Sequence, residues 1–213
     1  MVFCQTAPRA APGGVFMRVI AGTAKGRRLR VPAGLHVRPS GARLRESAFA
    51  ILEHRGAIEG ARVLDLFAGT GALGIEALSR GAATLVAVEK DRSVASLLQS
   101  NVEHAGFADR TRVIAQPAER ALAQLPAGEA FHLVLADPPY REGLAQPVLE
   151  RLAERSLVAP GGFVLVERAR GETLVWPENW ELELDRRFGD STITLLRMTQ
   201  PDLRSEVPTD AHP

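Results

Sequence analysis

The chain has 213 residues, of which 46% are hydrophobic and 24% charged, a composition typical of a globular protein with one large core. No apolar run approaches the roughly 20 residues that a membrane-spanning helix needs, so we expect no membrane contact. The single cysteine, Cys4, excludes an internal disulfide and a cysteine-based metal site, and the first residues lack the apolar segment of a signal peptide. A reducing cytoplasm is therefore the expected compartment.

The charge is distributed unevenly along the chain. Although the formal net charge is only +1, residues 1–45 contain nine Arg or Lys and no acid, which leaves a net charge of −8 on the remainder. A basic segment joined to an acidic body indicates that the segment meets a polyanion. A solvated basic surface is the alternative.

The N-terminal part is predicted to form small elements. Residues 1–16 show no periodic apolar face, so we expect a disordered extension and a functional start at Met17. Short strands at 17–22 and 27–31 are expected to form a hairpin with arginines on one face. Because a two-stranded ribbon buries little by itself, the hairpin must dock on the larger domain or on a ligand.

A helix capped by Ser40 is predicted to run to about His54. Arginines near a helix start oppose the helix dipole, which favours an anionic partner near Arg38, Arg43 and Arg45. A salt bridge with Glu46 or another acid is the alternative.

From residue 63 onward, strand-like and helix-like segments alternate, which is typical of parallel β-α-β units with helices on both faces of the sheet. We predict an α/β fold: a doubly wound, mostly parallel, seven-stranded Rossmann-like sheet in which the first five strands lie in the order 3-2-1-4-5, followed by an antiparallel C-terminal hairpin. The predicted strands are 63–66, 84–88, 111–115, 131–136, 162–167, 180–187 and 191–198. The expected organisation is the extension (1–16), a basic hairpin and helix (17–56), the α/β domain (57–199) and a disordered tail (200–213).

A glycine-containing turn follows the first strand of this domain. Gly69, Gly71 and Gly74 match the spacing G-x-G-x-x-G, which lets a ligand approach the backbone and the N-terminus of the next helix. Glu89 ends the following apolar run, where a carboxylate accepts both hydroxyls of a ribose. The pattern predicts a nucleoside-containing ligand, either a dinucleotide or S-adenosylmethionine, rather than a simple connector.

A second motif, Asp137-Pro138-Pro139-Tyr140, ends the fourth strand of the domain. With the predicted strand order it lies beside the glycine turn, where ligands of open α/β sheets bind. The prolines remove two backbone donors, so the segment presents carbonyl oxygens and a carboxylate next to an aromatic ring. Such a site suits an exocyclic amine stacked on Tyr140, whereas an Asx-Pro turn leaving a strand is the structural alternative.

Residues 65–71 together with 137–140 resemble the S-adenosylmethionine-dependent amino methyltransferases. From about Arg18 to Met198, the chain is similar to the bacterial 16S ribosomal RNA guanine-N2 methyltransferase family. The segments 18–22, 26–29, 38–40, 43–49 and 71–82 carry this closer resemblance. The chain departs from the family at 40–42, where relatives have a Thr-Thr-Asp type of sequence, and at Pro117, where many have Asp or Asn.

The resemblance implies a methyltransferase fold that uses S-adenosylmethionine and methylates a guanine N2 amine of 16S ribosomal RNA within a small-subunit assembly particle. The implied enzyme is a cytoplasmic monomer without a metal. The implied catalytic residues are Asp137, Pro138, Pro139 and Tyr140. The implied cofactor-binding residues are Asp65, Phe67, Ala68, Gly69, Gly71 and Glu89. Because Pro117 stands where relatives have Asp or Asn, Ala118 or the nearby backbone is expected to bind the adenine. The implied RNA-binding residues of the N-terminal appendage are Arg18, Lys25, Arg27, Arg28, Arg38, Arg43 and Arg45.

By this resemblance, the Asp137 carboxylate and the Pro138 carbonyl accept the hydrogens of the amine and orient its lone pair toward the methyl group. Three other functions remain open at this point: methylation of adenine N6 or cytosine N4 in DNA, a nicotinamide-dependent oxidoreductase, and a non-catalytic RNA-binding protein. His36, His54, His104 and His132 lack metal-ligand spacing and are interpreted as solvated or capping residues.

Overall fold

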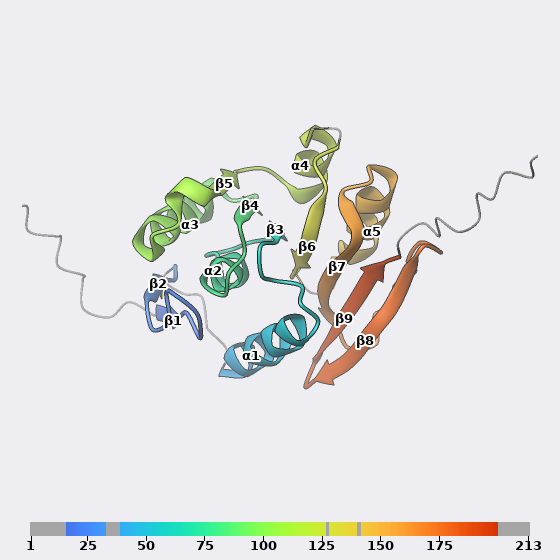
Figure 1. Cartoon of the computed structure of the whole chain (residues 1–213), viewed down its shortest axis with the longest axis horizontal. Coiled ribbons are helices and arrows are strands. Elements are labelled where there is room, and N and C mark those ends of the chain that lie inside the picture. The colour runs from blue at the N-terminus through green and yellow to red at the C-terminus, as the bar shows by residue number, and fades with distance from the viewer. Residues whose placement is uncertain (1–15, 33–38, 127, 140–141, 200–213) are drawn as a thin grey trace, which may run out of the picture.

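The computed structural model describes residues 16–32, 39–126, 128–139 and 142–199. Its main feature is a seven-stranded sheet that runs across the molecule (Figure 1). The strands are β3 (Arg62–Leu66), β4 (Thr84–Val88), β5 (Thr111–Ile114), β6 (Phe131–Ala136), β7 (Val158–Ala169), β8 (Trp180–Phe188) and β9 (Ser191–Met198). Their order in the sheet is β5-β4-β3-β6-β7-β9-β8.

The first five strands are parallel, whereas β9 pairs antiparallel with β7 and with the edge strand β8. Parallel strands covered on both faces become continuous apolar runs, which explains why 63–66 and 131–136 are almost wholly hydrophobic. The predicted sheet, its order 3-2-1-4-5 and the C-terminal hairpin are confirmed.

Helices cover both faces of the sheet (Figure 1). On one face lie α1 (Pro39–His54), α2 (Ala72–Ser79) and α3 (Arg92–Ala105); on the other lie α4 (Ala118–Gln124) and α5 (Ala145–Glu154). A short 3-10 helix, η1 (Ala108–Arg110), precedes β5. Successive strand residues alternate between the two cores, as with Val63 and Leu64. No helix in the described ranges is long and apolar enough to cross a membrane.

The N-terminal hairpin consists of β1 (Phe16–Arg18) and β2 (Arg28–Arg30), which pair antiparallel. Leu29 is buried and pairs with the half-buried Met17, while the arginines at 18, 28 and 30 are exposed. The prediction of a hairpin with arginines on one face is therefore confirmed. The strands are shorter than predicted, 16–18 and 28–30 in place of 17–22 and 27–31, and the first starts one residue earlier, because Phe16 belongs to β1 and not to the extension.

Helix α1 also differs from the prediction at its start. It begins at Pro39, so Ser40 lies within the first turn and the prediction that Ser40 precedes the helix as its cap is wrong. Proline suits the first helical position because its φ is already helical and its missing N–H would have no partner there.

The hairpin segment docks on α2 through a buried carboxylate. Glu76, 1% exposed, accepts hydrogen bonds from Ile20 N at 2.7 Å and Ala21 N at 3.0 Å, and Arg80 Nε donates to it at 2.7 Å. Gly22 adopts φ +78°, and a Cβ there would lie 1.7 Å from the Ser79 carbonyl oxygen, so only glycine fits. The hairpin therefore docks on the larger domain, as its small size requires.

We expect Glu76→Ala to lower the free energy of unfolding by about 3–5 kcal/mol, because it leaves two hairpin amides and the buried Arg80 Nε without their acceptor. Urea denaturation measures this change. Glu53→Ala is the matched control: Glu53 also pairs with Arg80, at 2.8 Å, but is 48% exposed, so its loss should cost less than about 1 kcal/mol. Equal losses in the two variants would contradict the anchoring role of Glu76.

Candidate functional site

The turn after β3 has an unusual backbone. Phe67, Gly69 and Gly71 have φ values of 63°, 54° and 87°, and the turn is closed by a hydrogen bond from Gly71 N to the Ala68 oxygen at 2.8 Å. A Cβ on Gly71 would lie 2.4 Å from Leu98 Cδ1, so α3 packs directly on the turn. The left-handed φ of Phe67 is strained for a residue with a side chain, a feature concentrated at functional sites.

Asp65 lies beneath this turn with 1% of its surface exposed. Its Oδ2 accepts a hydrogen bond from Gly74 N at 2.8 Å, in the first turn of α2, while its Oδ1 is buried without a partner among the described residues. Burial raises the pKa of Asp65 to about 7; Asp137 and Glu89 add to this effect, and the Gly74 N–H opposes it. A buried acceptor without a donor favours binding of a ligand that supplies one.

Three acidic residues meet at the carboxyl end of the sheet. Leu66 of β3 lies beside Val88 of β4 and Ala136 of β6, so Glu89 and Asp137 follow at the same edge. Glu89 accepts hydrogen bonds from Gly69 N and from Asp91 N, both at 2.9 Å. The predicted proximity of the glycine turn and the Asp137 segment is therefore observed.

A pocket of about 400 Å³ opens at this edge. It is lined by Phe67, Val88, Glu89, Lys90, Gln116, Pro117, Ala118, Glu119, Asp137, Pro139, Glu142, Leu144 and Val148. Of the predicted cofactor and catalytic residues, the lining includes Phe67, Glu89, Ala118, Asp137 and Pro139. The lining does not include Asp65, Ala68, Gly69, Gly71 or the buried Pro138. Tyr140 lies outside the described residues.

Gln116 is a lining residue that the sequence analysis missed. Its Oε1 is buried and has no hydrogen-bond partner in the described part of the chain. The available signal was its position: it is the polar residue that directly precedes Pro117, beyond the end of β5. A donor such as an adenine amino group would satisfy this oxygen.

The pocket is acidic. Four of its lining residues are Glu or Asp, and the one lysine among them, Lys90, lies 4.0 Å from a Glu142 carboxylate oxygen. Such a lining attracts a cation and repels a phosphate-rich ligand. Within the described ranges, no three His, Cys, Asp or Glu residues are grouped to hold a metal.

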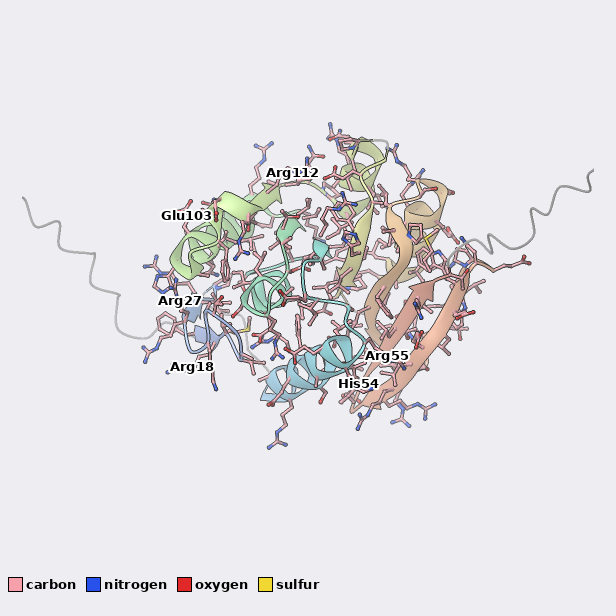
Figure 2. The ribbon with its side chains drawn as sticks, in the orientation of Figure 1. Arg18, Arg27, His54, Arg55, Glu103 and Arg112 are labelled. Atoms are coloured by element: carbon pink, nitrogen blue, oxygen red, sulfur yellow. The ribbon has the colours of Figure 1, made fainter. Side chains whose placement is uncertain are left out.

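The predicted RNA-binding residues separate into exposed and buried ones. Arg18, Lys25, Arg27 and Arg28 are exposed on the hairpin segment, as Figure 2 shows for Arg18 and Arg27, and Arg43 is exposed on α1. Arg38 lies outside the described residues.

Arg45 requires a correction. It is 7% exposed, its Nη2 donates to the Arg18 carbonyl oxygen at 2.9 Å, and burial lowers its pKa. Arg45 therefore supports the hairpin from inside and does not belong to the phosphate-binding set predicted from the sequence.

The outer face of the hairpin contains two residues absent from that set. Phe16 pairs with Arg30, both are exposed, and the Arg28 guanidinium lies 5.7 Å from the centroid of the Phe16 ring. Arg30 was not predicted, although the alternation of strand residues puts it on the same face as Arg28, and Phe16 was excluded by its assignment to the extension.

The family model described as conserved hypothetical protein 95 matches residues 17–197. The chain belongs to this family. It is 35% identical to the ribosomal RNA small subunit methyltransferase D of Escherichia coli K12 over 91% of this chain and 94% of the relative. It is 34% identical to the Haemophilus influenzae protein of the same name over 81% of this chain and 89% of that relative. The solved structure of Escherichia coli yhhF matches with a TM-score of 0.78 and 35% identity, covering 88% of this chain and 100% of that one. The family membership inferred from the motifs is confirmed.

The raised pKa of Asp65 predicts a pH dependence of stability. The unfolded carboxyl ionises near 3.8 but the folded one only near 7, so between these values the folded state binds more protons and stability falls as pH rises. We expect Asp65→Asn, whose amide oxygen still accepts from Gly74 N, to remove this contribution to the loss of stability with rising pH. Thermal unfolding of both proteins between pH 5 and 8 measures it. The same dependence of unfolding temperature on pH in both proteins would contradict the buried, unpaired state of Asp65.

Proposed function

We propose that this chain transfers a methyl group from S-adenosylmethionine to the exocyclic N2 amine of a guanine in small-subunit ribosomal RNA, in the bacterial cytoplasm. The observation that carries the proposal is the acidic pocket with Asp137 and Pro139 in its wall. The relatives named ribosomal RNA small subunit methyltransferase D, which match along most of their own length, support this class of substrate.

The residues of the pocket fit S-adenosylmethionine better than a nicotinamide dinucleotide. The acidic lining suits a ligand with a sulfonium and an ammonium group, and it opposes a pyrophosphate. In addition, Asp65 already occupies Gly74 N at the start of α2, where a dinucleotide would place a phosphate. The resemblance assigns Glu89 to the ribose and Asp65 to the ammonium group, which would donate to Asp65 Oδ1, an atom without a hydrogen-bond partner among the described residues. Gln116 Oε1 would accept an adenine amino hydrogen, and the Ala118 N–H at the start of α4 would donate to an adenine ring nitrogen.

When bound, the cofactor supplies an activated methyl group, so the chain needs neither a nucleophile nor a metal. Asp137 follows the last residue of β6, and two prolines that donate no backbone hydrogen bond come next. The Asp137 carboxylate and the Pro138 carbonyl accept the hydrogens of the guanine amine and direct its lone pair toward the methyl carbon. Alignment of two reactants in this way contributes on the order of 7–11 kcal/mol in favourable cases.

Residues 17–56 serve as the RNA-binding appendage and residues 57–199 as the methyltransferase domain in this proposal. The exposed face of the hairpin has three arginines and Phe16. Arginines contact phosphates with little sequence information, and an exposed aromatic ring offers a surface for base stacking. In this proposal the enzyme acts as a monomer on an assembly particle, and the target base leaves its helix to reach the pocket.

We expect Asp137→Asn to lower kcat by about 10²–10³-fold, since a neutral amide with one acceptor oxygen replaces the charged carboxylate that faces the amine. The assay is methyl transfer from labelled S-adenosylmethionine to small-subunit particles that lack their natural methylations, followed by nucleoside mass spectrometry. N2-methylguanosine is the expected product. Glu181→Gln, an exposed acid on β8, is the matched control and should retain activity.

Transfer to DNA but not to RNA would retain the methyl donor and overturn the substrate, in favour of adenine N6 or cytosine N4. RNA binding without any transfer would favour a non-catalytic RNA-binding protein.

We expect the double variant Arg18→Ala and Arg28→Ala to weaken RNA binding in a salt-dependent manner. Each lost phosphate contact lowers the slope of log affinity against log salt by about 0.7–0.9, so the pair should lower it by about 1.4–1.8. Filter binding at several salt concentrations measures the slope. Arg112→Ala is the control, since Arg112 lies on β5 away from the hairpin (Figure 2). An unchanged slope in the double variant would exclude the hairpin as a phosphate-binding surface.

A further inference from the structure

A buried amide connects the hairpin to the glycine turn. Asn101 of α3 is 1% exposed, and its side chain makes three hydrogen bonds. Its Oδ1 accepts from Arg30 N at 2.8 Å, and its Nδ2 donates to the Arg30 oxygen and to the Thr70 oxygen, both at 2.9 Å. One side chain therefore bonds to the proposed RNA-binding strand and to the turn beside the pocket.

The hydrogen-bonding pattern specifies an amide at this position. Arg30 presents an N–H and a carbonyl on the edge of β2. A primary amide accepts from this N–H and donates to this carbonyl, as the backbone of a neighbouring strand would. The second amide hydrogen is then used by Thr70. A flipped amide would set its NH₂ group against Arg30 N–H and its oxygen against two carbonyls, so a single orientation satisfies all three partners.

On the turn, the hydrogen bond from Asn101 reaches Thr70, whose neighbours in the chain are themselves held by contacts. Thr70 lies between Gly69 and Gly71; Gly69 N bonds to Glu89, which lines the pocket, and Gly71 packs against Leu98 of the same helix α3. On the hairpin, the side chain of Arg30 lies on the exposed face with Arg28. A displacement of the hairpin therefore acts through Asn101 on the turn that holds Glu89.

We propose that Asn101 is a positioning residue that couples binding of RNA on the hairpin to binding of the cofactor at the glycine turn. This inference rests on the proposed function, since it requires both ligands. Each ligand restricts a segment that Asn101 joins to the other, so the second ligand to bind meets a segment that is already ordered. Coupling of this kind is reciprocal: RNA raises the affinity for the cofactor by the same factor as the cofactor raises the affinity for RNA.

The test is a binding cycle with S-adenosylhomocysteine and unmethylated small-subunit ribosomal RNA. Calorimetry gives the affinity for S-adenosylhomocysteine with and without RNA, and the ratio is the coupling factor. We expect a factor of about 5 or more in the unaltered protein. In Asn101→Leu, which removes all three hydrogen bonds at similar volume, we expect a clearly smaller factor.

Ser79→Ala is the matched control. Ser79 is also 1% exposed and anchors the hairpin segment, because its hydroxyl accepts from Ala24 N and donates to the Ala21 oxygen, but no hydrogen bond joins it to the described glycine turn. This variant should weaken RNA binding and keep the coupling factor. A residue with only a structural role would lower stability and both affinities without changing the factor.

The outcomes separate the inference from the proposed function. If neither ligand binds the unaltered protein, the proposed function fails. If both bind with a factor near 1, or if Asn101→Leu keeps the factor, the coupling role of Asn101 is wrong.

Hydrogen exchange of the unaltered protein gives a test that needs no variant. S-adenosylhomocysteine should slow exchange at the glycine turn and also at Arg30 N–H, which donates to Asn101. Protection of the turn without any change in β2 would overturn the inference.

Discussion

The short helix α2 is fixed at two points by buried carboxylates, and the other parts of the site depend on its position. Asp65 accepts a hydrogen bond from Gly74 N in the first turn of the helix. Glu76, a residue of α2 itself, accepts hydrogen bonds from two backbone amides of the hairpin segment. Because α2 starts directly after the glycine turn, the same helix positions the pocket wall and the hairpin. Both carboxylates are 1% exposed, so their removal from water costs free energy that the hydrogen bonds offset.

The two carboxylates differ in how completely they are paired. Glu76 has two amides and a guanidinium as partners, as a buried structural ion pair requires. Asp65 has one amide on one oxygen and no described partner on the other, and burial raises its pKa to about 7. An incompletely paired carboxyl beside two further acids is a costly arrangement for an empty site and a favourable one for a cationic ligand. This contrast distinguishes Glu76, a fully paired carboxylate that anchors the hairpin, from Asp65, which the proposed function assigns to the ligand.

Much of the fold was predictable because it depends on local patterns. The strands 84–88 and 131–136 are observed at the predicted residues, since each is an apolar run with clear turn residues around it. The glycine turn and the Asp137 segment were likewise predicted to meet, because strand order brings the carboxyl ends of β3 and β6 together.

What the sequence did not predict depends on contacts between distant segments. Arg45 has the same residue type as the exposed arginines, and only its packing against Met17 and Arg18 shows that it is buried. The three hydrogen bonds of Asn101 join it to residues 31 and 71 positions away in the sequence. The spacing of apolar residues within one helix or strand gives no indication of such contacts. Gln116 became a candidate only when its oxygen was found buried in the pocket.

Calorimetric titration with S-adenosylhomocysteine at pH 7, in two buffers that differ in ionisation enthalpy, tests the central claim most directly. The claim is that the acids at the carboxyl ends of β3, β4 and β6 form a site for a nucleoside that carries an ammonium group. We expect binding with release of a fraction of a proton, because an ammonium group next to Asp65 favours its ionised form. Binding of a nicotinamide dinucleotide in place of S-adenosylhomocysteine would contradict the claim, and so would binding without proton release.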